Sequence, residues 1–168
     1  KNEEARSRKS KQLCFRYNQP DPRDGEGRER LGRELLGGTG ERLWLEAPIH
    51  FADGCHTTVG DHFYSNFNLT VVDDGRVSIG NSVMFGPNVT ISTTGHPVHP
   101  YYRMRGSPFS LPAVIEAGVW IGANVVVMPG VTICKNSVIG ARRVVTRDIP
   151  VNVVAFGTPC RVLFPFTD

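Results

Sequence analysis

Residues 115–144 read IEAGVW-IGANVV-VMPGVT-ICKNSV-IGARRV, a run of hexapeptides that each begin with isoleucine or valine. The place four residues after this aliphatic position is often valine. A repeat of six residues is typical of a parallel β-helix, in which each coil covers the apolar face of the coil below it. The period predicts an inward aliphatic residue at each of these positions: Ile115, Ile121, Val127, Ile133, Ile139, Val145 and Val151.

The same period is present earlier, at Ile79, Phe85 and Ile91. An all-β sandwich with chance spacing is the alternative, but it would require the same coincidence in every strand. If three hexapeptides make one triangular coil, residues on the same side recur every eighteen positions. The repeat therefore predicts a mainly β solenoid over residues 49–168.

Residues 1–48 follow a helical pattern instead of the six-residue repeat, which predicts a helical N-terminal region. Asp24 is a suitable N-cap for a helix over 25–36, in which Leu31, Leu35 and Leu36 share one face. The glycine pair at 37–38 is a suitable stop. We therefore expect an N-terminal helical segment followed by one solenoid domain.

Composition narrows the possible partners and the compartment. The chain has 168 residues, enough for one domain with a real core, and a formal net charge of only +3. Its basic N-terminal run lacks interleaved aromatic residues, so a solvated helix face explains it better than nucleic-acid binding. No apolar run is long enough to cross a bilayer. The four cysteines show no C-x-x-C spacing, and no secretory signal is evident, which favours a reducing, cytoplasmic location.

One long segment, residues 93–112, leaves the repeat and contains the sequence Thr94-Gly95-His96-Pro97-Val98-His99. A long loop inside a regular solenoid is usually functional. A metal site is a further possibility, because His50, His56 and His62 are spaced by six. On a triangular coil this spacing directs side chains to three different sides, and two loop histidines are too few for the usual site. We therefore predict no metal.

Several motifs together make the chain resemble the hexapeptide-repeat acetyltransferases, in particular the galactoside and maltose O-acetyltransferases. They are Asn66-Phe67-Asn68-Leu69-Thr70-Val71-Val72-Asp73-Asp74, Gly86-Pro87-Asn88-Val89-Thr90, the Thr94–His99 segment, Val119-Trp120-Ile121-Gly122 and Gly157-Thr158-Pro159-Cys160-Arg161. The resemblance extends from about Lys11 to Val162. It implies a left-handed parallel β-helix, acetyl-CoA as cosubstrate, and a homotrimer with active sites between subunits.

The resemblance also implies roles for individual residues. His96 matches the family's general base, a task for which histidine titrates near the required pH. His99 more simply caps neighbouring structure. Asn66 matches a residue that binds the acceptor and stabilises the transition state, although an asparagine ladder along the coils is a competing explanation. Asp74 matches an acceptor contact but also suits a turn. The positions that match the coenzyme A channel are Trp120, Ala123, Ala141, Thr146, Arg147 and Arg161.

The chain departs from the family pattern at several positions. Ala52 stands where sugar-acetylating relatives carry serine, and Pro108 where they carry a methionine that reaches the acceptor. Arg142 and Arg143 replace small residues, and Phe164 replaces a basic residue near the coenzyme. A further N-terminal helical segment of the family is not apparent in this sequence.

The leading hypothesis is acetyl transfer from acetyl-CoA to a hydroxyl group of a sugar or similar small molecule. An acetyltransferase for an antibiotic or another small alcohol is a close alternative. A third possibility is a catalytically idle trimeric β-helix that serves as an assembly module.

Overall fold

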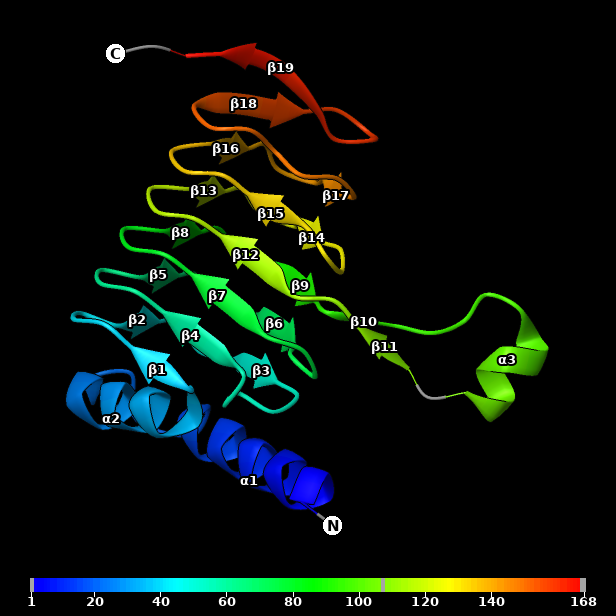
Figure 1. Ribbon diagram of the computed structural model, residues 1–168. Helices are drawn as coiled ribbons and strands as arrows, with labels where there is room; N and C mark the ends of the chain where they lie inside the picture. The colour runs from blue at the N-terminus through cyan, green and yellow to red at the C-terminus, as the bar shows by residue number, and fades with distance from the viewer. Residues whose placement is uncertain (1, 107, 167–168) are drawn as a thin grey trace.

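Three sheets of short strands form the sides of a triangular solenoid in the computed structural model, which describes residues 2–106 and 108–166 (Figure 1). Face A consists of β1 (Gly38–Thr39), β4 (Thr57–Val59), β7 (Val77–Ile79), β12 (Ala113–Ile115) and β15 (Thr132–Ile133). Face B consists of β2 (Trp44–Leu45), β5 (Tyr64–Ser65), β8 (Met84–Phe85), β13 (Trp120–Ile121), β16 (Val138–Ile139), β18 (Val153–Phe156) and β19 (Arg161–Pro165). Face C consists of β3 (Ile49–Phe51), β6 (Leu69–Val72), β9 (Thr90–Ser92), β14 (Val126–Val127) and β17 (Val144–Val145).

Neighbouring strands on each face are parallel, except that β19 turns back antiparallel to β18 at the C-terminal end. Strands of the three faces follow one another in chain order, so one pass through faces A, B and C completes a coil. The predicted parallel β-helix is therefore confirmed.

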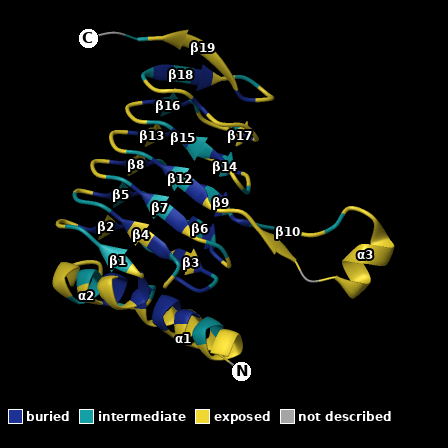
Figure 2. Ribbon diagram, viewed as in Figure 1, coloured by how far each residue is buried: buried dark blue, intermediate teal, exposed yellow. Residues whose placement is uncertain are grey.

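The interior is a stack of the aliphatic side chains that the six-residue period predicts. Ile115, Ile121, Val127, Ile133, Ile139 and Val145 are all fully or almost fully buried, and so are the valines at 119, 125 and 131. Figure 2 shows mainly buried and intermediate residues along the strands of the solenoid. The prediction for Val151 is wrong, because its side chain is 46% exposed. The chain returns to face A earlier, at Ile149, which bridges to Ile133.

The coils differ in length, and the difference lies at one edge. Trp44 pairs with Tyr64, 20 residues later, whereas Trp120 pairs with Val138, 18 residues later. The predicted spacing of eighteen therefore holds only after the long loop. In the early coils the extra residues lie between faces C and A, an edge that we call the C–A edge.

The solenoid begins at Gly38, well before the predicted boundary at residue 49. The helix expected after Asp24 is present as α2 (Gly25–Leu35), and the Asp24 carboxylate accepts the backbone N–H of Gly27 at 2.9 Å. A second helix, α1 (Asn2–Tyr17), precedes it, and the two lie across the N-terminal end of the solenoid (Figure 1). Among the described residues no helix is both long and apolar enough to cross a membrane.

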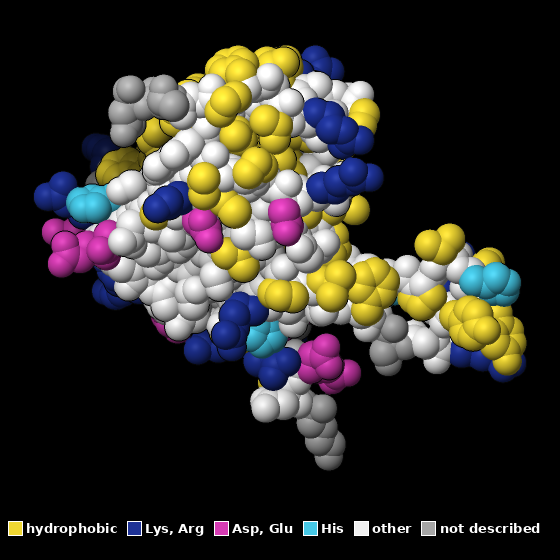
Figure 3. Space-filling view, turned by 45° about the horizontal axis from the view of Figure 1, so that its top comes forward, with side chains coloured by type: hydrophobic (Ala, Val, Ile, Leu, Met, Phe, Trp, Pro, Cys, Tyr) yellow, Lys and Arg dark blue, Asp and Glu magenta, His cyan; other side chains and the backbone are white. Residues whose placement is uncertain are grey.

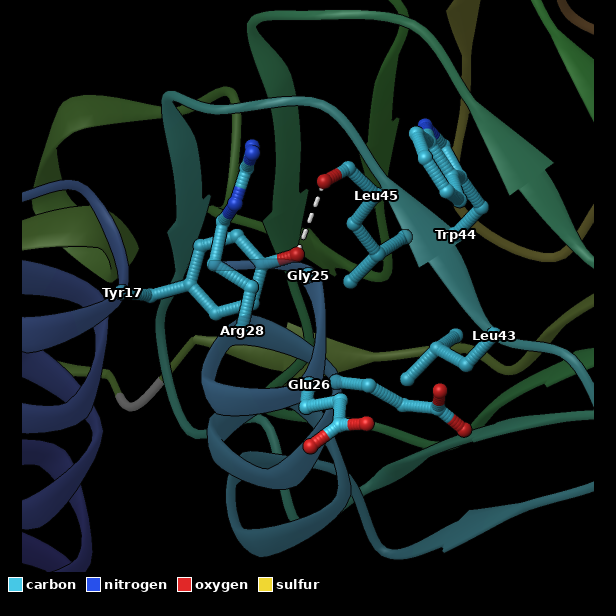
Figure 4. Close-up of a pocket in the computed structure, with 8 residues that line it drawn as sticks. Tyr17, Gly25, Glu26, Arg28, Leu43, Trp44 and Leu45 are labelled. Carbon is cyan, nitrogen blue, oxygen red and sulfur yellow. Dashed lines mark hydrogen bonds between the residues drawn. The ribbon is translucent and has the colours of Figure 1, made fainter. Parts of the chain in front are cut away.

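Side chains at α1 satisfy backbone carbonyls that the first coil leaves unpaired. The Tyr17 hydroxyl donates to the Leu45 carbonyl at 2.7 Å (Figure 4), and the Ser10 hydroxyl donates to the Phe51 carbonyl at 3.0 Å. The Asn18 amide, just after the helix, donates to the Ile49 carbonyl and accepts the Ile49 N–H. The helix therefore replaces the missing coil as a hydrogen-bond partner.

We predict that Tyr17→Phe lowers the free energy of unfolding by about 1–3 kcal/mol, because it leaves a buried carbonyl without its donor. The matched control is Tyr102→Phe, whose ring is 62% exposed and which should change stability by less than about 0.5 kcal/mol. Urea unfolding followed by circular dichroism, at equal protein concentrations, measures both. Equal midpoints for the two variants would show that the hydroxyl does not stabilise the cap.

Candidate active site

A short antiparallel hairpin holds the predicted base, His96. Its strands are β10 (Thr94–Gly95) and β11 (Phe109–Ser110), which leave the solenoid at the C–A edge between β9 and β12. Beyond the hairpin the loop carries α3 (Pro100–Arg105) and stands away from the coils (Figure 1). His96 follows β10 directly, is exposed, and makes no hydrogen bond to any described residue. Its ring nitrogens are therefore available to a substrate.

His99 has a structural task within the loop. It is the N-cap of α3, and its Nδ1 accepts the backbone N–H of Tyr101 at 3.2 Å. Its ring also packs edge-on against Tyr102, with 5.6 Å between the ring centroids. This agrees with the capping role favoured for His99, although the element that it caps is α3 and not a neighbouring coil.

Asp74 connects the hairpin to the coil below it. Its carboxylate accepts a hydrogen bond from the Thr94 hydroxyl, and Thr93 similarly receives the N–H of Gly75 on its own hydroxyl at 2.9 Å. Asp74 also lines a cleft of about 640 Å³ together with Ala52, Asp53 and residues of α1. Two of the positions that the resemblance connects with the acceptor, 52 and 74, thus lie in one cleft, whereas Asn66 does not line it.

A buried cluster of polar groups supports this cleft. Asp73 is fully buried and accepts the Asp53 N–H at 2.9 Å and the Thr57 hydroxyl at 2.8 Å. Burial raises the pKa of the Asp53 carboxyl above its usual range, although nearby His56 and Arg6 oppose the shift. Arg6 of α1 lies 3.9 Å from this carboxylate, so the cluster also connects the helix to the coil.

Asn66 lies at the edge between faces B and C, which we call the B–C edge. Its Oδ1 accepts the Phe67 N–H at 2.8 Å, which leaves the amide N–H groups free to donate. An asparagine ladder does exist, but it is formed by Asn68, Asn88 and Asn124 on the outside of the same edge. Asn66 is not a rung of that ladder.

The positions matched to the coenzyme are divided between the two edges. Ala123 and Ala141 lie at the B–C edge near Asn66, whereas Thr146 and Arg147 lie at the C–A edge, above the loop that carries His96. Trp120 stands out from face B and is 51% exposed, and Arg161 begins β19. Within one chain, face C therefore separates Asn66 from His96.

The three spaced histidines lie apart in the structure. His50 is on β3 of face C, His56 binds the Asp73 carbonyl through Nδ1 at 2.8 Å, and His62 adopts a left-handed turn conformation before β5. No group of three metal-ligating side chains comes together within residues 2–106 and 108–166.

Comparisons with known proteins agree with this geometry. The family model for the bacterial transferase hexapeptide (six repeats) matches residues 112–146, and the model for the maltose acetyltransferase hexapeptide capping motif matches residues 3–40. The galactoside O-acetyltransferase of Escherichia coli K12 is 49% identical over 95% of this chain and 79% of its own length. The chain belongs to the hexapeptide-repeat acetyltransferases, alongside the galactoside O-acetyltransferases.

Solved structures of this acetyltransferase family have the same fold. A galactoside acetyltransferase in complex with coenzyme A superimposes with a TM-score of 0.97 at 47% identity, covering all of this chain and 84% of that chain. A maltose O-acetyltransferase from Clostridium difficile 630 gives 0.98 at 36% identity, with coverage of 100% and 90%. The capping motif of the family coincides with α1, α2 and β1, the segment that closes the N-terminal end of the solenoid.

Two features of this acetyltransferase were not predicted as parts of a site. Arg8 and Lys11 of α1 line the cleft with Asp74, although the basic run was interpreted as a solvated face. The basic run in the sequence indicated these residues, but only the packing of α1 against the coils shows that Arg8 and Lys11 face the cleft. The second feature is Arg143, whose guanidinium lies over the Phe156 ring at 4.0 Å from its centroid. This contact joins two successive coils and is not part of the six-residue repeat.

Gly95 allows the hairpin to close, because the Phe109 ring lies where a β-carbon at position 95 would be. We predict that Gly95→Ala displaces the hairpin and loosens the loop that it anchors, so that trypsin cuts after the exposed Arg103 or Arg105 several times faster. In a Phe109→Ala background, Gly95→Ala should have little further effect on the cleavage rate, because the ring that clashes with the new β-carbon is absent. Mass spectrometry of timed digests measures this double-mutant cycle. Additive effects of the two substitutions would contradict the proposed close contact.

Proposed function

We propose that this chain transfers an acetyl group from acetyl-CoA to a hydroxyl of a sugar or similar small molecule, with His96 as general base. Relatives across the length of the chain are named galactoside O-acetyltransferases, and solved neighbours contain coenzyme A or acetyl-CoA. The observation that carries the role of His96 is its position: an exposed imidazole fixed by the β10–β11 hairpin beside the Asp74 cleft.

The proposed reaction is a direct transfer. His96 accepts the proton of the acceptor hydroxyl as its oxygen attacks the thioester carbonyl carbon. The new C–O bond forms, the C–S bond breaks, and the proton passes to the departing coenzyme A sulfur. The free amide N–H groups of Asn66 donate to the negative charge that develops on the carbonyl oxygen. Direct transfer involves no acetylated thiol: the loop contains no cysteine, Cys14 and Cys160 are buried, and Cys55 and Cys134, which are accessible, lie outside the loop.

The acceptor side of the site is the cleft between α1 and the C–A edge. Asp74 offers a carboxylate to acceptor hydroxyl groups, and Arg8 and Lys11 add donors from α1. Ala52 supplies no hydroxyl where sugar-acetylating relatives carry serine, so the polar contacts of this cleft come from its charged residues and from Ser7. This lining fits a polar, hydroxyl-rich acceptor.

The coenzyme side fits the cosubstrate through unpaired cations. Arg147 and Arg161 are exposed, and neither forms an ion pair with any described residue. Guanidinium groups of this kind suit the phosphates of coenzyme A. Ala123 is half-buried and Ala141 is exposed at the corner between faces B and C, and their small side chains leave room for the pantetheine arm.

Division of the site between two edges supports a homotrimer with sites between subunits. Asn66 lies at the B–C edge and His96 at the C–A edge, so a neighbour must bring the second edge to the first. Face B also carries an outward column of mainly apolar side chains in register along the solenoid, of which Trp44, Met84 and Trp120 are exposed and Tyr64 and Val138 are half-buried. Such a column suits an interface. Four free cysteines also fit the cytoplasm as the site of action.

We predict that His96→Ala lowers kcat by about 10²–10⁴-fold while coenzyme A binding persists, because the base acts only on the acceptor proton. His99→Ala is the matched control and should have a milder effect, since this histidine caps α3. Thiol release from acetyl-CoA, with a panel of galactosides, other sugars and small alcohols, measures the activity. Equal losses for the two variants would mean that the wrong histidine was assigned, and wild-type inactivity on the whole panel would favour an idle module.

We also predict that two inactive variants complement each other. Mixed trimers of His96→Ala and Asn66→Ala subunits would contain one site in three with both residues intact, so a randomly reassembled equal mixture should recover about one quarter of wild-type activity. The control is a mixture of the same subunits without dissociation and reassembly, which should stay inactive. A monomer by light scattering, or no recovery after subunit exchange, would contradict a site shared between subunits.

A further inference from the structure

A cavity of about 410 Å³ lies at the C-terminal part of the B–C edge and is lined by Asn124, Arg142, Arg143 and Val144. Two of its four lining residues are arginines, and Val144 contributes an exposed apolar wall. None of its lining residues was predicted to bind the coenzyme, although Ala123 and Ala141 precede two of them in the chain. In Figure 3, Lys and Arg side chains stand out along the upper right margin of the solenoid near this end.

The last asparagine of the ladder, Asn124, lines this cavity and has a side-chain amide that can donate hydrogen bonds. Asn68 donates its amide to Asn88 at 2.9 Å, and Asn88 donates to Asn124 at 3.1 Å. The next rung is Arg142, which has the same left-handed backbone conformation, with φ of 61° against 58° for Asn124. Arginine has no acceptor. The amide N–H groups of Asn124 therefore face a second donor, and no described residue accepts from them.

Arg143 is held in place but its charge is not neutralised. Its guanidinium lies over the Phe156 ring, and Nη1 makes long hydrogen bonds to the Thr158 hydroxyl at 3.3 Å and the Arg142 carbonyl at 3.1 Å. Its Nε is buried and has no partner among the described residues. A partly buried cation without a counter-charge is costly, so an anion bound here would be stabilising.

No carboxylate competes for these cations within the described residues. Neither Arg142 nor Arg143 forms an ion pair there, and the Asp148 carboxylate lies at the C–A edge, where it accepts the Thr132 N–H at 2.8 Å. Arg143 and Arg161 both lower the pKa of the Cys160 thiol, against the larger raising effect of burial, so the two cations lie in the same neighbourhood. The polar lining of the cavity thus consists of hydrogen-bond donors and positive charge, beside the apolar wall of Val144.

We propose that Arg142, Arg143 and the Asn124 amide form a phosphate-binding site. Two guanidinium groups and one amide match the several oxygen acceptors of a phosphate better than the two of a carboxylate. The phosphate comes either from the nucleotide end of coenzyme A or from a free phosphate anion. The first source rests on the proposed function, whereas the second does not.

The test compares the wild type with Arg142→Gln/Arg143→Gln by isothermal titration calorimetry. Arg16→Gln/Arg30→Gln removes the same charge at exposed positions outside the cavity and serves as the control. The titrants are coenzyme A, 3′-dephospho-coenzyme A and inorganic phosphate. Circular dichroism checks that each variant is folded, and the single variant Arg142→Gln, at a fully exposed position, replaces the double variant if Arg143 is needed for folding.

If coenzyme A supplies the phosphate, the cavity variant should bind coenzyme A at least about tenfold more weakly than the control variant. An unchanged affinity for 3′-dephospho-coenzyme A would then assign the 3′-phosphate, and an equal loss would assign the pyrophosphate. If the source is a free anion, inorganic phosphate binding should be lost in the cavity variant while coenzyme A affinity stays the same. Wild-type affinity for both ligands in the cavity variant, or no phosphate and no coenzyme A binding by the wild type, overturns the site. A wild type that binds phosphate but not coenzyme A would overturn the proposed function alone.

Discussion

Hydrogen bonds between successive coils run along the solenoid axis, and the rest of the structure depends on this direction. Each inner coil forms backbone hydrogen bonds with the coil before it and the coil after it. The first and last coils therefore leave backbone N–H and C=O groups without a partner coil. At the N-terminal end Ser10, Tyr17 and Asn18 supply the missing partners. At the C-terminal end β19 reverses and covers β18 as an antiparallel edge. The helical segment is therefore a structural part of the solenoid, which explains why the family has a capping motif.

The same direction of bonding confines variation to the corners. The inward side chains must stack in register, so a coil can accommodate additional residues only at its corners. In this protein the additional residues of the early coils lie at the C–A edge. The longer corners bury polar groups that bond to one another, as the Asp73 carboxylate does with the Asp53 N–H and the Thr57 hydroxyl. The Asp74 cleft and the His96 hairpin both occupy this edge. The proposed base and the acceptor cleft thus lie at the irregular edge, whereas Asn66 lies at the regular B–C edge.

The repeat was readable from the sequence because each coil after Ile115 buries one aliphatic residue every six positions. It failed where corner length changed: no period predicts that Ile149 rather than Val151 turns inward, or that the early coils have 20 residues. His96 could be identified because its loop interrupts the repeat. Arg143 could not, because its contacts with Phe156 and Thr158 depend on how the last coil closes. The sequence did not reveal that Asn66 and His96 lie at different edges, because the edge on which a residue lies depends on the length of each preceding coil.

The loop of residues 93–112 enters and leaves at one corner, and the coils on either side pair directly: Met84 with Trp120, and Thr90 with Val126. The backbone ladder is continuous across the insertion, so the loop is accommodated without a break in the scaffold. Its length and composition can then drift during evolution at little cost to folding, whereas a change inside a coil is felt by both neighbours. This loop can therefore be exchanged as one segment while the pairing of the coils stays the same.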